Sequence, residues 1–349
     1  MADEKETGSS HPVINKLESL FDGFTLGPQE RIFPYASLED WFDPYGGLKL
    51  EHRAFLNSED RFTHHFKFET PRDYSWKIRY LANSLSTEKT KFSFLFKIKF
   101  DQDAFFYGIG NSTSKLERDP ATYASVFFGS EVRQRISQKW VFSWSPGYWH
   151  VRSGLKTGGE FEKPASAKYM TSRFAFGGIK PVNYRSTAIE NQWTSYAELG
   201  IPLTSSISTY LRLNFQTNTR IPVYRSSKLG VETRMEYLVS TDRDLVPYFA
   251  VSEVGSRTGL RGFSKERFRN FGISVVSVEY SVPISNDFEA FLLTDFAQTA
   301  SNLKDYITNN IHLDYGFGLR LISLKHPISF GIANSREDLK LFSNINIIF

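Results

Sequence analysis

The sequence predicts an all-β protein, a transmembrane antiparallel β-barrel of about sixteen strands. Aromatic residues make up 16% of the 349 residues, with 32 Phe and 17 Tyr, yet the mean hydropathy is only -0.35. No uninterrupted apolar run approaches the roughly 18 residues of a membrane-spanning helix. Apolar and polar residues instead alternate, as expected when successive side chains face lipid and a wet lumen.

The stretch from Phe92 to Phe100, FSFLFKIKF, shows this alternation most clearly. Its phenylalanines and Ile98 share one face, and Lys97 and Lys99 share the other. Two lysines on one strand face require water on that side. A soluble sandwich would show the same alternation, so the pattern defines a fold class and no family.

The first 45 residues have a different pattern from the rest. Apolar residues at helical spacing between His11 and Gly23 predict a short amphipathic helix, and a frayed linker is the alternative. We therefore expect a periplasmic N-terminal extension over 1–45 and the barrel over 46–349. The first ten residues lack the basic and apolar regions of a secretion signal, so we expect the signal peptide to be missing from this sequence.

Period-two segments bounded by short turns predict the remaining strands. After 62–70 and 92–100, they lie near 120–131, 135–147, 168–177, 187–200, 206–216, 231–239, 244–251, 270–283, 287–297, 310–323, 327–334 and 339–349. The last strand would place Ile345, Ile347 and Phe349 on the lipid face. Closing it against the first strand, which carries Leu48 and Leu50, would remove both unpaired edges.

A glycine-rich loop that carries an arginine, Gly255 to Phe263, lies between two of these segments. If it folds into the lumen, Arg261 leaves bulk water and needs fixed carboxylate or carbonyl acceptors. The alternation places Glu279 and Asp295 on the lumen faces of the next two strands. An ion pair with these carboxylates would pin the loop, whereas the alternative is an exposed hairpin with a solvated arginine.

Three motifs in order carry a family resemblance. Leu260 to Phe263, LRGF, resembles the VRGF/VRGY tip of the inward-folded sixth extracellular loop of the Omp85 superfamily, the outer-membrane barrels of BamA and TamA type. Val278 to Pro283 is similar to the family's EYRxPL strand, and Leu293 to Asp295 to its FxD strand. FYGIGN, which ends at Asn111, and GFGLR, which ends at Arg320, add weaker matches. The N-terminal 45 residues are too short for one POTRA domain, so the resemblance covers the barrel alone.

The resemblance implies an inward-folded loop at 252–269 and a set of residues that lock it. Those residues are Arg261, Gly259, Gly262, Phe263, Glu279 and Asp295. Gly259 and Gly262 would permit the tight, positive-φ backbone that a loop tip needs.

The implied function is non-catalytic help with the insertion, assembly or translocation of proteins or lipids at the bacterial outer membrane. Family members are thought to work through a weak seam between the first and last strands. The implied partners are outer-membrane lipids and lipopolysaccharide, client outer-membrane proteins and a periplasmic partner. A passive channel or a structural barrel without client handling is the alternative function.

Other classes of protein find little support in the sequence. There is no Cys, and the net charge of +4 is small and contains no block of like charge, so no nucleic-acid partner is expected. GxSxG, HExxH and Walker motifs are missing from the sequence. We expect no catalytic residues, no metal site and no cofactor.

Overall fold

The structure is a computed structural model, and it consists almost entirely of β-strands. It describes residues 24–27, 29–40, 43–54, 58–70, 72–116, 118–157, 160–161, 165–178, 189–224, 226–256, 259–302, 304–308, 310–322 and 328–345. The predicted helix at His11 to Gly23 lies outside these residues.

The strands follow one another with short connections. They are β1 (Phe24–Gly27), β2 (Glu30–Asp40), β3 (Asp43–Arg53), β4 (Arg61–Thr70), β5 (Asp73–Ala82), β6 (Thr90–Phe106), β7 (Asp119–Arg135), β8 (Trp140–Thr157), β9 (Glu160–Phe161), β10 (Ala165–Gly178), β11 (Glu190–Pro202), β12 (Tyr210–Pro222), β13 (Lys228–Ser240), β14 (Ser252–Val254), β15 (Phe268–Asn270), β16 (Gly272–Pro283), β17 (Phe288–Ala300), β18 (His312–Leu321), β19 (Ile328–Ser335) and β20 (Leu339–Ile345). In the described residues, three short helices accompany them, η1 (Asn83–Leu85), η2 (Tyr248–Ala250) and α2 (Asp305–Thr308). No helix in the described ranges is long and apolar enough to span a membrane.

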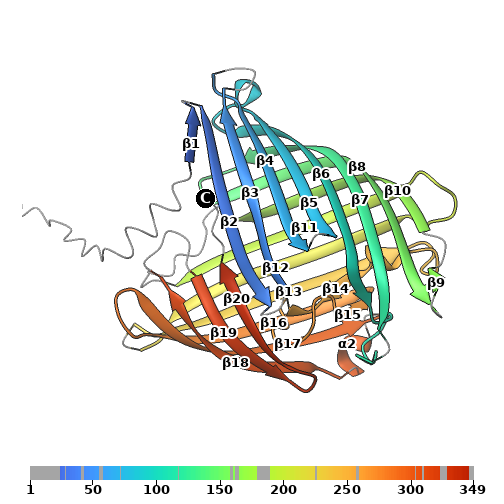
Figure 1. Cartoon of the computed structure of the whole chain (residues 1–349), viewed down its shortest axis with the longest axis vertical. Coiled ribbons are helices and arrows are strands. Elements are labelled where there is room, and N and C mark those ends of the chain that lie inside the picture. Colours follow the sequence, from blue (N-terminus) through green and yellow to red (C-terminus); the bar gives the residue numbers. More distant parts are fainter. Residues whose placement is uncertain are drawn as a thin grey trace, which may run out of the picture.

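The strands form a barrel (Figure 1). The described residues form one sheet of 18 strands, and without the short strands β1 and β9 it is a ring of sixteen. Each strand of the ring pairs antiparallel with its neighbour in the chain, and β20 returns to pair with β2. The predicted fold class and strand number are thus confirmed.

The two faces of the wall differ as the alternation predicts. On β4, β5 and β6 the outer face is aromatic: the rings of Phe66 and Trp76 stack at 5.3 Å, and those of Tyr74 and Phe100 at 4.9 Å. The intervening residues of these strands, such as Lys97, face the lumen. Because side chains alternate along a strand, the outer face can meet lipid while the inner face stays polar.

The barrel begins earlier in the chain than predicted. The boundary at residue 46 is wrong, because β2 (Glu30–Asp40) forms a full ladder with β3, from Glu30 opposite His52 to Asp40 opposite Asp43. Pro34 interrupts the sequence pattern of this strand. Proline is tolerated on edge strands, and β2 is the first strand of the ring.

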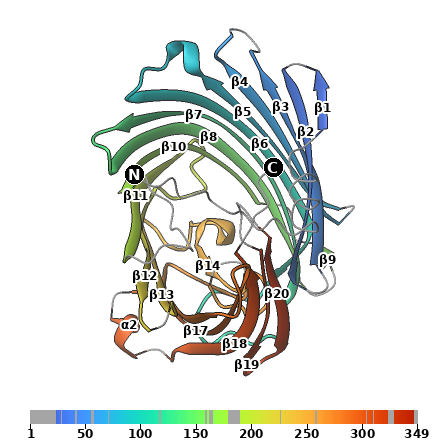
Figure 2. The same cartoon turned by 90° about the vertical axis from the view of Figure 1, so that its left-hand side faces the viewer.

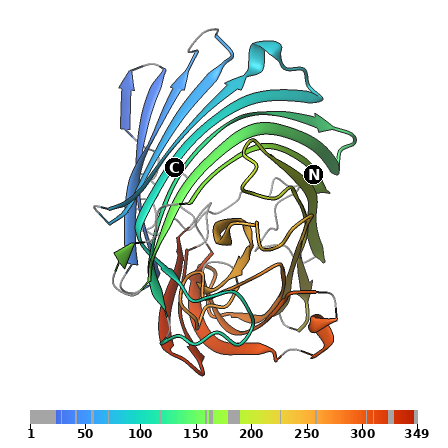
Figure 3. The ribbon, with the colours of Figure 1, turned by 90° about the vertical axis from the view of Figure 1, so that its right-hand side faces the viewer.

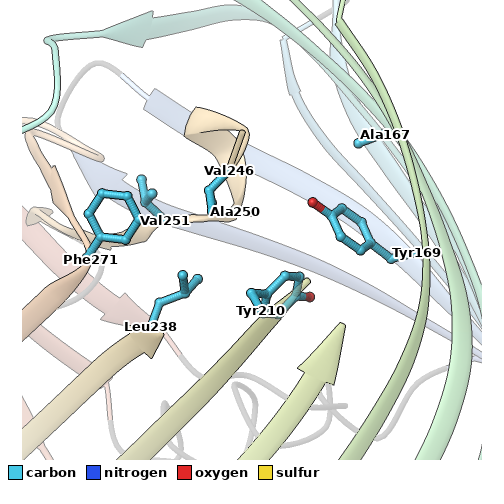
Figure 4. Packing of buried hydrophobic residues seen from close by; sticks show 8 residues of the cluster. All are labelled: Ala167, Tyr169, Tyr210, Leu238, Val246, Ala250, Val251 and Phe271. Carbon is cyan, nitrogen blue, oxygen red and sulfur yellow. The ribbon is translucent and has the colours of Figure 1, made fainter. Parts of the chain in front are cut away.

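The predicted strand at 244–251 is also wrong. This segment contains Pro247 and forms η2, which lies inside the barrel. Val246, Ala250 and Val251 pack there against Tyr169, Tyr210 and other lumen-facing residues of β10, β12 and β13 (Figure 4). An apolar run that packs into a lumen looks the same in sequence as a strand that packs against lipid.

Candidate functional site

The connection between β13 and β16, residues 241–271, folds back into the barrel (Figures 2 and 3). It is the sixth connection at its end of the barrel in chain order. Within it, β14 and β15 form a short antiparallel pair, with Ser252 opposite Asn270. Within this pair, Glu253 lies opposite Arg269. Burial raises the pKa of the Glu253 carboxyl, and the Arg269 guanidinium at 2.8 Å opposes that rise.

Apolar burial contributes much of the free energy that holds the loop. Leu260, Phe263 and Phe268 are each 0% exposed and pack against Ile273 and Val275 of β16. Full burial of such side chains contributes about 1.5–3 kcal/mol each. The polar contacts described next therefore mainly determine where the loop tip rests.

Arg261 reaches the carboxylate of Asp295 on β17. Its Nη1 lies 3.0 Å from Asp295 Oδ1, and its backbone N–H donates to Oδ2 at 3.2 Å. Asp295 is fully buried, whereas the Arg261 side chain is 25% exposed. The guanidinium also lies over the ring of Phe342 on β20, 5.7 Å from its centroid. The loop tip thus contacts the last strand of the barrel.

A second carboxylate, Asp314 on β18, binds the backbone of the loop tip. The Gly262 N–H donates to Asp314 Oδ2 at 2.8 Å, and the Ser335 hydroxyl donates to the Gly262 carbonyl at 2.8 Å. A Cβ at Gly262 would lie 2.8 Å from the Asp314 Cβ, so the close approach requires glycine. Gly259 has a φ of +110°, which also favours glycine.

Glu279 has a different partner from the one expected. It faces the lumen, as predicted, but its carboxylate binds Arg320 through two contacts of 2.6 and 2.8 Å. Arg220 lies 3.4 Å away on the other side. The reason is position along the strand: Ser277 lies opposite Asp295 in the β16–β17 ladder, and Glu279 is two residues nearer the other end of the barrel.

A second arginine of the loop, Arg267, is 1% exposed and was not singled out from the sequence. It binds both carboxylate oxygens of Glu337 at 2.8 and 2.9 Å and the Thr113 hydroxyl at 2.9 Å. Its guanidinium also lies 4.9 Å from the centroid of the Tyr107 ring. The sequence motif that could have indicated this contact is FYGIGN, because Tyr107 lies within it and Thr113 follows it by two residues.

The FYGIGN segment covers the loop from the end of the barrel. The Gly110 N–H donates to the Arg269 carbonyl at 2.8 Å. The buried Asn111 side chain accepts the Thr299 N–H at 3.0 Å and donates to the Asn310 carbonyl at 2.7 Å. The loop is therefore bound to the wall, to this segment and to the turn after β19.

The first strand of the ring is not the one predicted. Leu48 and Leu50 are on β3, which pairs along its length with β2 and with β4, so β3 is not the terminal strand. Ile345 ends β20 and pairs with Ile328 of β19. Ile347 and Phe349 lie outside the described residues.

The first strand of the ring is β2, and its link to β20 is short. Among the described residues, the β2–β20 ladder holds one pair, Asp40 with Phe342. A strand has two hydrogen-bonding edges, and β3 occupies one of them. β1 must therefore use the same edge as β20, and it does so at the opposite end, where Phe24 lies opposite Ile32 (Figure 1).

The fold resembles those of solved barrel proteins. BamA from Haemophilus ducreyi lacking POTRA domains 1–3 has a TM-score of 0.70 at 12% identity, over 90% of this chain and 70% of that one. CdiB from Acinetobacter baumannii has a TM-score of 0.58 at 10% identity, over 91% and 60%. CdiB from Escherichia coli has a TM-score of 0.60 at 10% identity, over 92% and 64%. This chain therefore spans less than two thirds of either CdiB.

The ring of strands and the inward loop define a β-barrel with a loop of its own chain folded into the lumen. More specifically, the fold is the one that these BamA and CdiB barrels share. No protein-family model and no curated protein matches the sequence.

The site binds backbone and side chains of the chain itself. In the described part of the chain, no group of three or more His, Asp or Glu side chains is placed to hold a metal ion. Between the loop and the wall, a polar cavity of about 310 Å³ is lined by residues that include Lys99, Tyr123, Arg212, Glu236 and Arg269. The arrangement therefore provides a loop that is fixed to the inner wall and the edge of β2 that faces β20.

Proposed function

We propose that this chain is a non-catalytic outer-membrane barrel that assists the insertion, assembly or translocation of other proteins through the seam between β2 and β20. The observation that carries this proposal is the single pair, Asp40 with Phe342, that joins the two strands in the described residues. Each backbone hydrogen bond contributes about 0.5–1.5 kcal/mol net, so parting this link costs far less than parting the β2–β3 ladder.

The edge of β2 that faces β20 suits an extended client segment. Strand addition uses backbone hydrogen bonds and needs no particular side chain, so one edge can accept many sequences. Within the chain, β1 already pairs with this edge, between Phe24 and Ile32. The edge therefore accepts a strand in addition to β20.

The inward loop supports the same function by a different route. Arg261 lies over Phe342, the residue of β20 that pairs across the seam. The Arg261 contact with Asp295 thus fixes the loop next to the seam and holds β20 in place from the lumen side. We propose that the residues that lock the loop, Arg261, Gly259, Gly262, Phe263 and Asp295, set the seam rather than catalyse a reaction.

Quantitative proteomics of the outer membrane after depletion of the protein tests this function. We expect selective loss of one or a few barrels or surface proteins, which would be the clients. An unchanged outer-membrane proteome would contradict the proposal.

Conductance distinguishes the passive-channel alternative. Because residues 241–271 fold into the lumen, we expect little single-channel conductance from the protein in planar bilayers. A large conductance that rises further in Arg261→Ala would favour a channel.

A further inference from the structure

A row of basic side chains crosses the inner wall of four adjacent strands. Lys49 on β3 lies directly opposite His65 on β4, which lies opposite Lys77 on β5, which lies opposite Lys97 on β6. Neighbouring strands are about 4.8 Å apart, so the row is about 14 Å long. Two lysines, Lys77 and Lys97, are direct cross-strand neighbours.

The row faces the lumen. The outward positions of the same strands carry the stacked rings of Phe66 and Trp76. Asp101 is four residues after Lys97 on β6, so the two side chains point to the same face of the strand. Lys265 of the inward loop reaches Asp101 at 3.4 Å, which places this face on the lumen side. The side chains of Lys77 and Lys97 are exposed to the lumen.

Carboxylates on this wall are already occupied by other cations. Glu51 lies within 3.1–3.6 Å of Lys49, Arg53 and Arg61. Glu131 binds Arg79 and Arg133 at 2.9 and 3.1 Å, and Asp101 binds Lys99 and Lys265 at 3.3 and 3.4 Å. Within the described ranges, neither Lys77 nor Lys97 has a carboxylate at ion-pair distance.

Like charges directly opposite each other destabilise a sheet. A pair of opposed lysines in a lumen therefore lowers the stability of the apo barrel and favours an anion between them. The surrounding wall has low dielectric constant and carries one sign of charge in excess, which strengthens the attraction for such an anion.

The residue types point to phosphate. A lysine ammonium is a compact charge with three donors on a flexible stem, and it binds phosphate as a point charge. Planar carboxylates are matched by the fork of arginine, and the row itself contains none. Two ammonium groups from neighbouring strands can converge on one tetrahedral anion.

The position of the row indicates the source of the phosphate. Its first residue, Lys49, is on β3, the strand next to β2 and its seam edge. A lipid headgroup that enters between β2 and β20 can reach the row while its acyl chains stay in the membrane. We propose that Lys77 and Lys97, with Lys49 and His65, bind the phosphate of an anionic membrane lipid in the lumen.

This proposal depends on the proposed function only for the entry route, because binding is measured without any client. The probes are phosphatidic acid and phosphatidylcholine with identical acyl chains, each offered to the full chain in zwitterionic detergent and counted by native mass spectrometry. We expect phosphatidic acid to bind in preference to phosphatidylcholine, with the preference falling as salt is raised. The Lys77→Gln, Lys97→Gln double variant should bind phosphatidic acid about tenfold more weakly.

The matched control removes the same charge elsewhere: Lys89→Gln with Lys139→Gln, two exposed lysines in turns. It should bind phosphatidic acid within about twofold of the unaltered protein. Heat-modifiable migration on a gel verifies that every variant is folded. If the double variant does not fold, phosphatidic acid binding is measured with Lys77→Gln and Lys97→Gln separately.

Three results would overturn the proposal. The first is equal binding of phosphatidic acid by the Lys77, Lys97 double variant and the control. The second is displacement of the lipid by equimolar pyrophosphate, which would make the ligand a soluble phosphate. The third is displacement by an equimolar hexaglutamate peptide, which would make it an acidic polypeptide.

Discussion

Asp295 is the residue whose change should most directly release the loop tip. Asp295→Asn removes the carboxylate that binds the Arg261 guanidinium and backbone. A fully buried pair would cost about 3–5 kcal/mol, and the partial exposure of Arg261 lowers the expected loss to about 2–3 kcal/mol. The measurement is protease cleavage within 252–269 in the folded barrel, which should become faster.

Glu279→Gln is the matched control, because Glu279 binds Arg320 and Arg220. We expect the loop to stay protected in this variant while the thermal stability of the barrel falls. If Glu279→Gln exposes the loop as much as Asp295→Asn does, the division of roles between the two carboxylates is wrong.

Arg267 offers an independent test at the same scale. Arg267→Lys cannot bind both Glu337 oxygens and Thr113 together, since lysine lacks the planar fork. We expect a loss of about 2–3 kcal/mol in loop docking, seen as faster hydrogen exchange over 105–116 and 252–270. Arg133→Lys, at a half-exposed pair with Glu131, should leave exchange in both segments unchanged.

At this scale, sequence reasoning identified which side chains point into the lumen. It did not choose between the two candidate partners of Arg261. Period-two alternation placed Glu279 and Asp295 on the lumen side, and the structure agrees. It could not tell which carboxylate meets Arg261, because that depends on the register between β16, β17 and β18. Register is a long-range property that one strand's pattern does not contain.

At the scale of elements, the close fit of the loop tip against β18 and β19 depends on Gly262. A Cβ there would lie 2.8 Å from the Asp314 Cβ and 3.1 Å from the Ser335 Cβ. We expect Gly262→Ala to weaken docking of the loop by about 1–3 kcal/mol through overpacking. Hydrogen exchange over 259–270 measures this.

Gly230 on β13 provides the matched control, because an added Cβ would have its nearest neighbours at 3.7 Å, an ordinary contact. Gly230→Ala should leave exchange in the loop unchanged. Equal loosening in both variants would mean that the effect comes from the barrel as a whole and not from the loop tip.

The two elements that sequence reasoning misplaced were misplaced for different physical reasons. β2 (Glu30–Asp40) was missed because Pro34 interrupts its pattern, and 244–251 was taken for a strand because its apolar residues resemble a lipid face. The predicted number of about sixteen strands was still right, although β5 (Asp73–Ala82) was also missing from the predicted segments. Strong alternation, as in β6, was enough to place most of the other strands because lipid and water impose opposite demands on the two faces.

At the scale of the whole molecule, the barrel has one weak junction and one buried plug beside it. Every neighbouring pair in the ring from β2 to β20 shares a ladder of several pairs, whereas β20 and β2 share one pair in the described residues. The loop that fills the lumen contacts β20 through Arg261 and Phe342. Closure of the barrel and docking of the loop are therefore physically linked.

The measurement that tests this account most directly is client insertion by a barrel whose seam is covalently closed. The chain has no Cys, so Asp40→Cys with Phe342→Cys creates a single bridge across the seam. Leu48→Cys with Phe66→Cys is the control, because it bridges a pair within the β3–β4 ladder. The assay follows folding of a denatured outer-membrane protein into liposomes that contain each variant.

We expect the oxidised seam variant to lose its acceleration of client folding and to regain it when the bridge is reduced. The oxidised control should accelerate folding as well as the unaltered protein does. Full acceleration by the oxidised seam variant would contradict the account, because clients would then be handled without parting β2 from β20.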